Sequence, residues 1–214
     1  EAFQVPKADF TLNDACLGAL VSMVNNSEIS SGEMDYQWEI SDGSAYEDKN
    51  PVHMFDNPGA YSVCLLVNSK HNCSDTLTKS TTIFPIPNAS FEFDNKCLGK
   101  TTTFLNTSNI DKGEISLFEW DLGNGVQSNV QNIDHTYQYH GNYRVKLTAT
   151  SDKGCKNSAM ENVMVYPLPV VDFSFSNECV YEEVLFTNLS DVDKGFLSYN
   201  WKFGDGTDSQ LEST

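Results

Sequence analysis

The sequence predicts an all-β fold made of tandem copies of one small domain. Trp38, Trp120 and Trp201 lie 82 and 81 residues apart, and a constant step of this length is the signature of a repeated unit. No window shows a sustained apolar stripe with the helical period of 3.6 residues, so the repeated unit is predicted to consist of strands. Two further sets of residues keep nearly the same step: Cys16, Cys97 and Cys179, and Phe10, Phe91 and Phe173.

Each copy opens at a proline and continues with two strands. The joints read Val5-Pro6, Ile86-Pro87 and Leu168-Pro169. Proline cannot donate to a central ladder and fixes φ, so it suits the crossing from one domain to the next. In the second copy, Phe91 then lies in an alternating strand, and residues 101–105 are predicted to form the next strand.

A tryptophan strand then leads into a tight turn. The tryptophan is expected to be a large buried anchor between two sheets. The Gly-Asx-Gly sequence after it permits positive φ, which other residues resist. The turn glycines are Gly123 and Gly125 in the second copy and Gly204 and Gly206 in the third, whereas the first copy has Ser41 at the first of these positions.

The clearest strand of the second copy is 141–149, where Tyr143, Val145 and Leu147 alternate with polar residues. A period of two with one polar face is typical of an antiparallel sheet. Tyr61 is the equivalent of Tyr143 in the first copy. Each tyrosine is expected to place its ring in the core and tie its hydroxyl to a nearby carbonyl, as in a tyrosine corner.

The repeat divides the chain into four segments. Residues 1–6 are predicted to be the last strand of a preceding copy with its linker, 7–86 the first domain, 87–168 the second, and 169–214 the N-terminal part of a third. The third copy stops just beyond its Gly-Asp-Gly turn. Either this boundary is artificial, with the chain an excerpt of a longer array, or another chain supplies the missing strands; we favour the first explanation.

The chain is strongly acidic. Thirteen basic and thirty acidic residues give a net charge of −17 and a pI of about 4.3. Such a surface repels phosphate and anionic lipid, so nucleic acid is not an expected partner. Because no run of about 18 apolar residues is present, we expect no direct insertion into a membrane.

Each complete copy owns one early and one late cysteine. Cys73 and Cys155 lie 82 residues apart, both after the tyrosine strand, and we predict the disulfides Cys16–Cys73 and Cys97–Cys155. A metal site, the alternative, would need closely spaced cysteine pairs, which the sequence lacks. Disulfides indicate an oxidising compartment, so we expect a secreted protein located outside the cell or on its surface. Cys64 has no repeat equivalent and is expected to be a free thiol, with a disulfide to another chain as the alternative.

These motifs resemble the PKD domain, named for the polycystic kidney disease protein. The similarity rests on Trp120-Asp-Leu-Gly-Asn-Gly125, Trp201-Lys-Phe-Gly-Asp-Gly206, His135-x-Tyr137 and Gly141-x-Tyr-x-Val-x-Leu147. It extends over essentially all of the chain and implies tandem immunoglobulin-like β-sandwiches, two complete copies plus a truncated third. With its paired cysteines, the sequence is similar to a subtype found in secreted Bacteroidota proteins, including gliding-motility adhesins and other cargo of type IX secretion.

No enzyme is expected in this chain, and no cofactor. His53 and His135 are repeat equivalents, which favours a structural hydrogen-bonding role, and none of the common catalytic motifs is present. One metal alternative stays open. Oxygen-rich turns that can hold calcium are present at two equivalent places, although both lack the bidentate acid of an EF-hand loop and a plain Asx turn explains them as well. The turn residues are Asn109, Asp111, Asp191 and Asp193.

We therefore expect a non-enzymatic extracellular stalk or adhesion module, part of a long repeat array similar to that of a gliding-motility adhesin. The alternative is an accessory module of a secreted multidomain hydrolase that binds polysaccharide or protein. A row of exposed aromatic side chains, for which Phe118, Tyr137 and Tyr139 are candidates, would favour the alternative. The expected partners are other repeats of the same longer chain and extracellular protein or polysaccharide.

Overall fold

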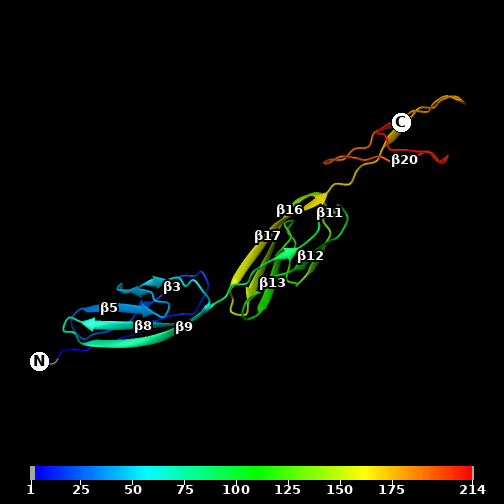
Figure 1. The fold of residues 1–214 in the computed structure, drawn as a ribbon. Helices are drawn as coiled ribbons and strands as arrows, with labels where there is room; N and C mark the ends of the chain where they lie inside the picture. The colour runs from blue at the N-terminus through cyan, green and yellow to red at the C-terminus, as the bar shows by residue number, and fades with distance from the viewer. Residues whose placement is uncertain (1–2, 214) are drawn as a thin grey trace. The chain divides into compact units, whose positions relative to one another are not determined.

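The computed structural model describes residues 3–213, which form strands β1–β21 and no helix (Figure 1). The strands of the first copy are β1 (Phe10–Thr11), β2 (Ala15–Cys16), β3 (Val21–Ser22), β4 (Val24–Asn25), β5 (Met34–Ile40), β6 (Ala45–Tyr46), β7 (Val52–His53), β8 (Gly59–Ser69) and β9 (Ser74–Phe84). Those of the second copy are β10 (Phe91–Glu92), β11 (Lys96–Cys97), β12 (Thr102–Asn106), β13 (Ile115–Asp121), β14 (Gln127–Ser128), β15 (Ile133–His135), β16 (Gly141–Ser151) and β17 (Lys156–Tyr166). The remaining strands are β18 (Phe173–Phe175), β19 (Phe186–Asn188), β20 (Trp201–Lys202) and β21 (Asp208–Ser209).

The first copy is a β-sandwich whose larger sheet has the order β2-β9-β8-β5-β6. Short pairs, β1 with β4 and β3 with β7, form the opposing layer. The long hairpin of β8 and β9 pairs Gly59 with Ile83 and continues to Asn68 with Ser74. Alternation along β8 buries every second side chain, and these meet Phe10 from the opposing layer in one core. The fully buried residues include Phe10, Trp38, Val63, Leu65 and Val67.

The second copy repeats this arrangement, except that the single strand β12 takes the place of β3 and β4. Its larger sheet has the order β11-β17-β16-β13-β14, and β10-β12-β15 faces it. The first strand of each copy is also held in the same register, since Phe10 pairs with Asn25 and Phe91 with Asn106. In both copies the early-cysteine strand, β2 or β11, runs parallel to the end of the last strand. The predictions of an all-β fold and of two tandem sandwiches are confirmed.

The third copy begins in the same way and forms a small β region. Phe173 pairs with Asn188, which repeats the register of the first two copies, and Trp201 pairs with Ser209. Phe173 is nonetheless 50% exposed, because within the described residues 169–213 no equivalent of the long β8–β9 hairpin covers it. Residues 3–6, assigned by sequence to the end of a preceding copy, belong to no strand, and residues 1 and 2 lie outside the described part.

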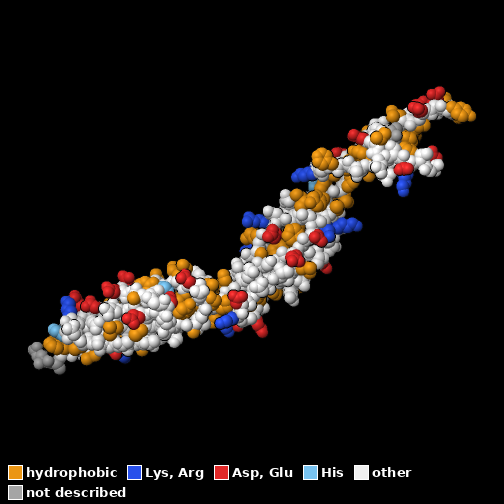
Figure 2. Space-filling model, viewed as in Figure 1, with side chains coloured by type: hydrophobic (Ala, Val, Ile, Leu, Met, Phe, Trp, Pro, Cys, Tyr) orange, Lys and Arg blue, Asp and Glu red, His pale blue; other side chains and the backbone are white. Residues whose placement is uncertain are grey.

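By contacts the chain forms two compact units that do not coincide with the copies. One comprises Glu1–Ala89, Ser108–Phe118 and Thr148–Ser158; the other comprises Ser90–Thr107, Glu119–Leu147 and Ala159–Thr214. Figure 2 shows acidic side chains spread over the visible face of the chain, with fewer basic ones among them. Across residues 3–213 the structure contains no helix with the length and apolar character needed to cross a bilayer.

Candidate functional site

The three tryptophans have the same surroundings. Trp38 and Trp120 are 0% and 2% exposed, and Trp201 is half-buried. Each indole Nε1 donates to a backbone oxygen ten residues further on, at 2.9–3.0 Å. Each ring also makes a T-shaped contact with the phenylalanine from the first strand, with centroids 5.1–5.5 Å apart. The tryptophan is therefore a packing anchor whose single polar atom is satisfied, which leaves it no chemical role.

The histidine of each complete copy binds the Asx residue of the tight turn. In the first copy, His53 Nε2 lies 2.8 Å from Asp42 Oδ2, and His53 Nδ1 lies 2.7 Å from the hydroxyl of Tyr46. In the second copy, Asn124 Nδ2 lies 2.9 Å from His135 Nε2. An amide replaces the carboxylate without loss of the contact. The replacement of Asp42 by Asn124 is compatible with a hydrogen bond that holds the turn against the next strand. It is not compatible with a proton relay shared by the two copies, because an amide does not ionise.

The protonation of this network follows from its contacts. Burial works against ionisation of Asp42, but hydrogen bonds from Ser44 and His53 outweigh it, so the pKa of the carboxyl lies below its ordinary value. Burial lowers the pKa of His135, because the charged imidazolium is the form that desolvation disfavours. In the third copy, hydrogen bonds from Thr207 lower the pKa of Asp205 at the equivalent turn position.

The turn glycines are required by conformation and, at one of them, by space. Gly123, Gly125, Gly204 and Gly206 all have φ between +74° and +96°. A Cβ on Gly123 would lie 2.8 Å from both the backbone nitrogen and the oxygen of Arg144 in β16. In the first copy Ser41 takes this place, and its hydroxyl instead accepts a hydrogen bond from Ser62 N at 3.1 Å.

Tyr61 and Tyr143 make the same contact four residues back along the chain. The hydroxyl of Tyr143 donates to Tyr139 O at 2.7 Å, and that of Tyr61 donates to Asn57 O at 2.9 Å. Tyr137 stacks on Tyr143 and donates to Leu122 O at 3.0 Å. Burial, with a smaller contribution from Tyr143, raises the pKa of Tyr137 to about 12.

The aromatic row considered from the sequence does not form. Tyr137 is 2% exposed, Phe118 is half-buried, and only Tyr139 among the three has an open ring, at 75% exposure. Tyr137 is buried because its ring stacks on that of Tyr143. Strand alternation does not reveal such a position.

The calcium candidates lie in exposed turns and do not converge. Asn109 and Asp191 are held by backbone bridges to Asn88 and Val170. Asp111 is exposed, and Asp193 Oδ2 lies 3.7 Å from His140 Nδ1. Within residues 3–213 no three acidic, histidine or cysteine side chains are grouped so that they could hold a metal ion.

The predicted disulfide pairing is wrong. The structure joins Cys16 to Cys155, with their Cα atoms 5.6 Å apart, and both cysteines belong to the same compact unit. Cys73 and Cys97, the predicted partners, are free thiols, as are Cys64 and Cys179. The bridge therefore connects the early cysteine of the first copy to the late cysteine of the second. No disulfide closes within either copy.

Strand length explains the error. Cys16 pairs with Phe84 at the end of β9, whereas Cys73 directly precedes Ser74 at its start. An 11-residue strand separates its ends by roughly 33 Å at about 3.3 Å per residue. A disulfide needs Cα atoms closer than about 7 Å. Cys97 and Cys155 lie at opposite ends of β17 in the same way.

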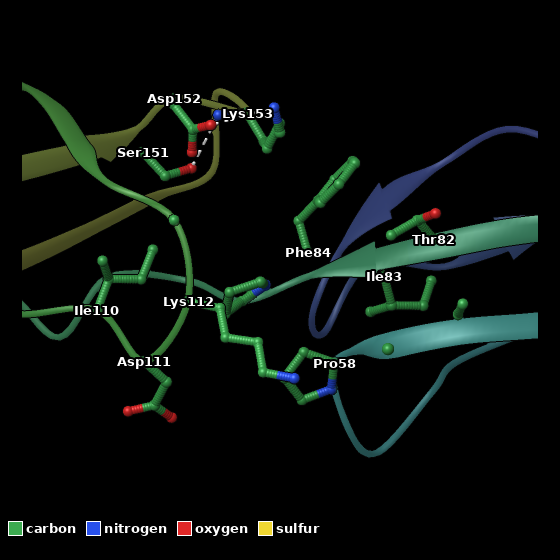
Figure 3. Close-up of a pocket in the computed structure, with 14 residues that line it drawn as sticks. Pro58, Thr82, Ile83, Phe84, Ile110, Asp111, Lys112, Ser151, Asp152 and Lys153 are labelled. Carbon is green, nitrogen blue, oxygen red and sulfur yellow. Dashed lines mark hydrogen bonds and ion pairs between the residues drawn. The ribbon is translucent and has the colours of Figure 1, made fainter.

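A cavity of about 420 Å³ lies in the same compact unit as the bridge (Figure 3). The first copy contributes the ends of β8 and β9, with Pro58, Ile83 and Phe84. The second copy contributes its turns at 110–113 and 151–153. Asp152 lies next to Lys153, to which it is paired at 3.1 Å. No group there has the arrangement of a nucleophile with a base.

Comparison with known proteins agrees with this arrangement. The profile of the PKD domain family matches residues 4–84 and 85–165. Over 91 residues the chain is 33% identical to a Clostridium perfringens protein named collagenase ColA, a match covering 41% of this chain and 8% of that protein. Over 167 residues it is 30% identical to the Vibrio cholerae pre-pro-metalloprotease PrtV, covering 76% of this chain and 18% of that protein.

The chain is also similar in sequence to a protein of known structure. The PKD1 domain of the Vibrio cholerae metalloprotease PrtV is 34% identical, with a TM-score of 0.36, and the match covers 37% of this chain and 96% of that one. The chain spans less than a fifth of the length of the two curated relatives described. Since the family profile accounts for both complete sandwiches, this chain belongs to the PKD domain family.

Proposed function

We propose that this chain is a non-catalytic accessory segment of a secreted multidomain hydrolase, in which it contacts extracellular protein or polysaccharide beside a catalytic domain. The relatives named as a collagenase and a metalloprotease support this context. The disulfide supports an extracellular location, because such bonds persist in oxidising compartments.

The observation that carries the non-catalytic assignment is the use of the repeated tryptophan, histidine and tyrosine polar groups as framework contacts. The indole nitrogens, the histidines and the strand tyrosines all bind backbone or turn atoms of their own copy. A residue held in this way in successive copies serves the sandwich, since catalysis would need it at one site with a free reactive atom.

A stalk in a cell-surface adhesin, similar to a gliding-motility adhesin, is the second candidate. The bridge between Cys16 and Cys155 favours it, because a covalent link between consecutive copies suits a spacer. In this role the partners would be other repeats of the same longer protein, with no ligand bound by these copies.

Co-sedimentation with insoluble material distinguishes the two candidates. The chain is mixed with collagen fibres, crystalline cellulose or chitin, and the fraction in the pellet is measured against an acidic globular protein of similar charge. An accessory binding module predicts saturable retention on at least one of these materials, reduced in a Tyr139→Ser variant, because the Tyr139 ring is 75% exposed and open to a ligand. Retention no greater than that of the control protein would reject binding and favour the stalk.

A further inference from the structure

The late cysteines of the two complete copies are presented by the same loop. Ser151 N donates to Cys155 O at 2.8 Å, and Cys155 N donates to Ser151 Oγ at 3.1 Å. Around Cys73 the two corresponding bonds, made by Ser69, measure 2.9 and 3.2 Å. Cys155 is bonded and Cys73 is a free, half-buried thiol.

The early cysteines are equivalent in the same detail. Cys16 pairs in parallel with Phe84, and Cys97 pairs in parallel with Tyr166. The residue after each cysteine donates to the same strand-end carbonyl, at 2.9 Å in the first copy and 2.8 Å in the second. Each turn then closes with a 3.0 Å bond back to the cysteine carbonyl through a glycine at φ +80° or +78°. Cys16 is bonded, whereas Cys97 is free and exposed.

The turn beside the bridge also has a counterpart at the start of the third copy. Pro58 and Asp111 line the cavity near the first joint. Their equivalents, His140 and Asp193, lie 3.7 Å apart, and both belong to the second compact unit. The turn that contains Asp193 in the third copy therefore lies near the end of the second copy that holds its early cysteine. The turn that contains Asp111 in the second copy has the same place relative to the first copy.

We propose that every joint of this repeat is crossed by a disulfide from the early cysteine of one copy to the late cysteine of the next. Where a further complete repeat follows, Cys97 would bond to its late cysteine, in the loop equivalent to Ser151–Cys155. Where a repeat precedes, Cys73 would bond to its early cysteine. The two cysteines of one copy thus link it to both neighbours, and they never bond to each other.

The chemistry is thiol–disulfide exchange. The thiols of Cys97 and its partner lose two protons and two electrons as the S–S bond forms. A small-molecule or protein disulfide accepts the electrons and is reduced to two thiols. A chain linked in this way would keep its joints closed under tension, because opening a joint would require a covalent bond to break.

Disulfide mapping of the native protein tests the proposal. The full-length mature protein that contains these residues is treated with iodoacetamide to block free thiols, digested without reductant and analysed by mass spectrometry. We expect the Cys97 peptide to be cross-linked to a peptide from the late-cysteine loop of the following repeat. Cys64, which has no repeat equivalent, serves as the internal control and is expected to carry the alkyl group.

Either of two results would overturn the proposal. One is a Cys97 peptide that is alkylated as a free thiol in the mature protein. The other is a Cys97 peptide joined to a cysteine that is not the late cysteine of the next repeat. Cys155, Cys73 and Cys179 are such cysteines. Either result rejects the proposed disulfides whether the chain is an accessory segment or a stalk, so this test does not depend on the function proposed above.

Discussion

His135 has a structural role, although histidine is a common catalytic residue in enzymes: it forms a hydrogen bond that holds the tight turn against the next strand. Its Nε2 is hydrogen-bonded to Asn124, and its ring packs in a T-shaped contact with Tyr137 at a centroid distance of 4.6 Å. The sequence indicated this role through the matching His53, because the repeat placed a histidine at the same position in both complete copies. The partner atoms were beyond prediction, since the turn must fold before Asn124 and His135 come together.

The lowered pKa of His135 makes the stability of the second copy depend on pH. The unfolded chain takes up a proton near pH 6.5, at a higher pH than the folded copy does. The contribution of neutral His135 to the free energy of unfolding is therefore complete above pH 6.5, and it is lost as the pH falls towards the pKa of the folded state. In His135→Gln, which keeps an acceptor for Asn124, we expect a smaller difference between the unfolding free energies at pH 8 and pH 5.

Urea denaturation at the two pH values measures this difference. His71→Gln is the matched control, because His71 is exposed. The control is expected to retain the pH dependence of the parent chain. Identical pH dependence in the parent and in His135→Gln would show that His135 does not titrate differently on folding.

The turn between β13 and β14 depends on space as well as on backbone conformation. Gly123 and Gly125 have similar positive φ values, +74° and +88°. A Cβ on Gly125 would meet nothing within 4 Å, whereas one on Gly123 would overlap the backbone of Arg144. Only Gly123 therefore sets the distance between the turn and the neighbouring strand.

The two glycines should respond differently to alanine. Gly125→Ala is expected to cost about 1–2 kcal/mol, the penalty of a left-handed conformation for a residue with a Cβ. Gly123→Ala should cost distinctly more, because β16 must also move. Urea denaturation of the two variants measures both losses, and equal losses would contradict the close approach of Arg144.

Strands were easier to predict than the links between them. Alternation over 141–149 identified β16, which runs from Gly141 to Ser151, and the segment 101–105 differs by one residue at each end from β12, Thr102–Asn106. These patterns are local, so each strand can be read from its own residues. Cysteine spacing carries no information about which end of a strand a residue occupies, and this is why Cys16 was assigned to Cys73 when its partner is Cys155.

At the scale of the whole molecule, residues at equivalent positions of the repeat have the same structural role. The tandem architecture could be predicted because Trp38, Trp120 and Trp201 recur at one step, and the structure gives all three the same partners. The covalent connection between copies could not be predicted, because it depends on how one folded copy meets the next. Sequence comparison places the chain in a family without fixing what a particular member binds.

The two complete copies share one fold and are joined to each other by a disulfide, and neither is closed by a disulfide of its own. A disulfide map of this chain, digested without reductant after its free thiols are blocked, measures this directly. We predict one cross-linked species, which joins the peptide of Cys16 to that of Cys155. Cross-links of Cys16 to Cys73 and of Cys97 to Cys155 would contradict it.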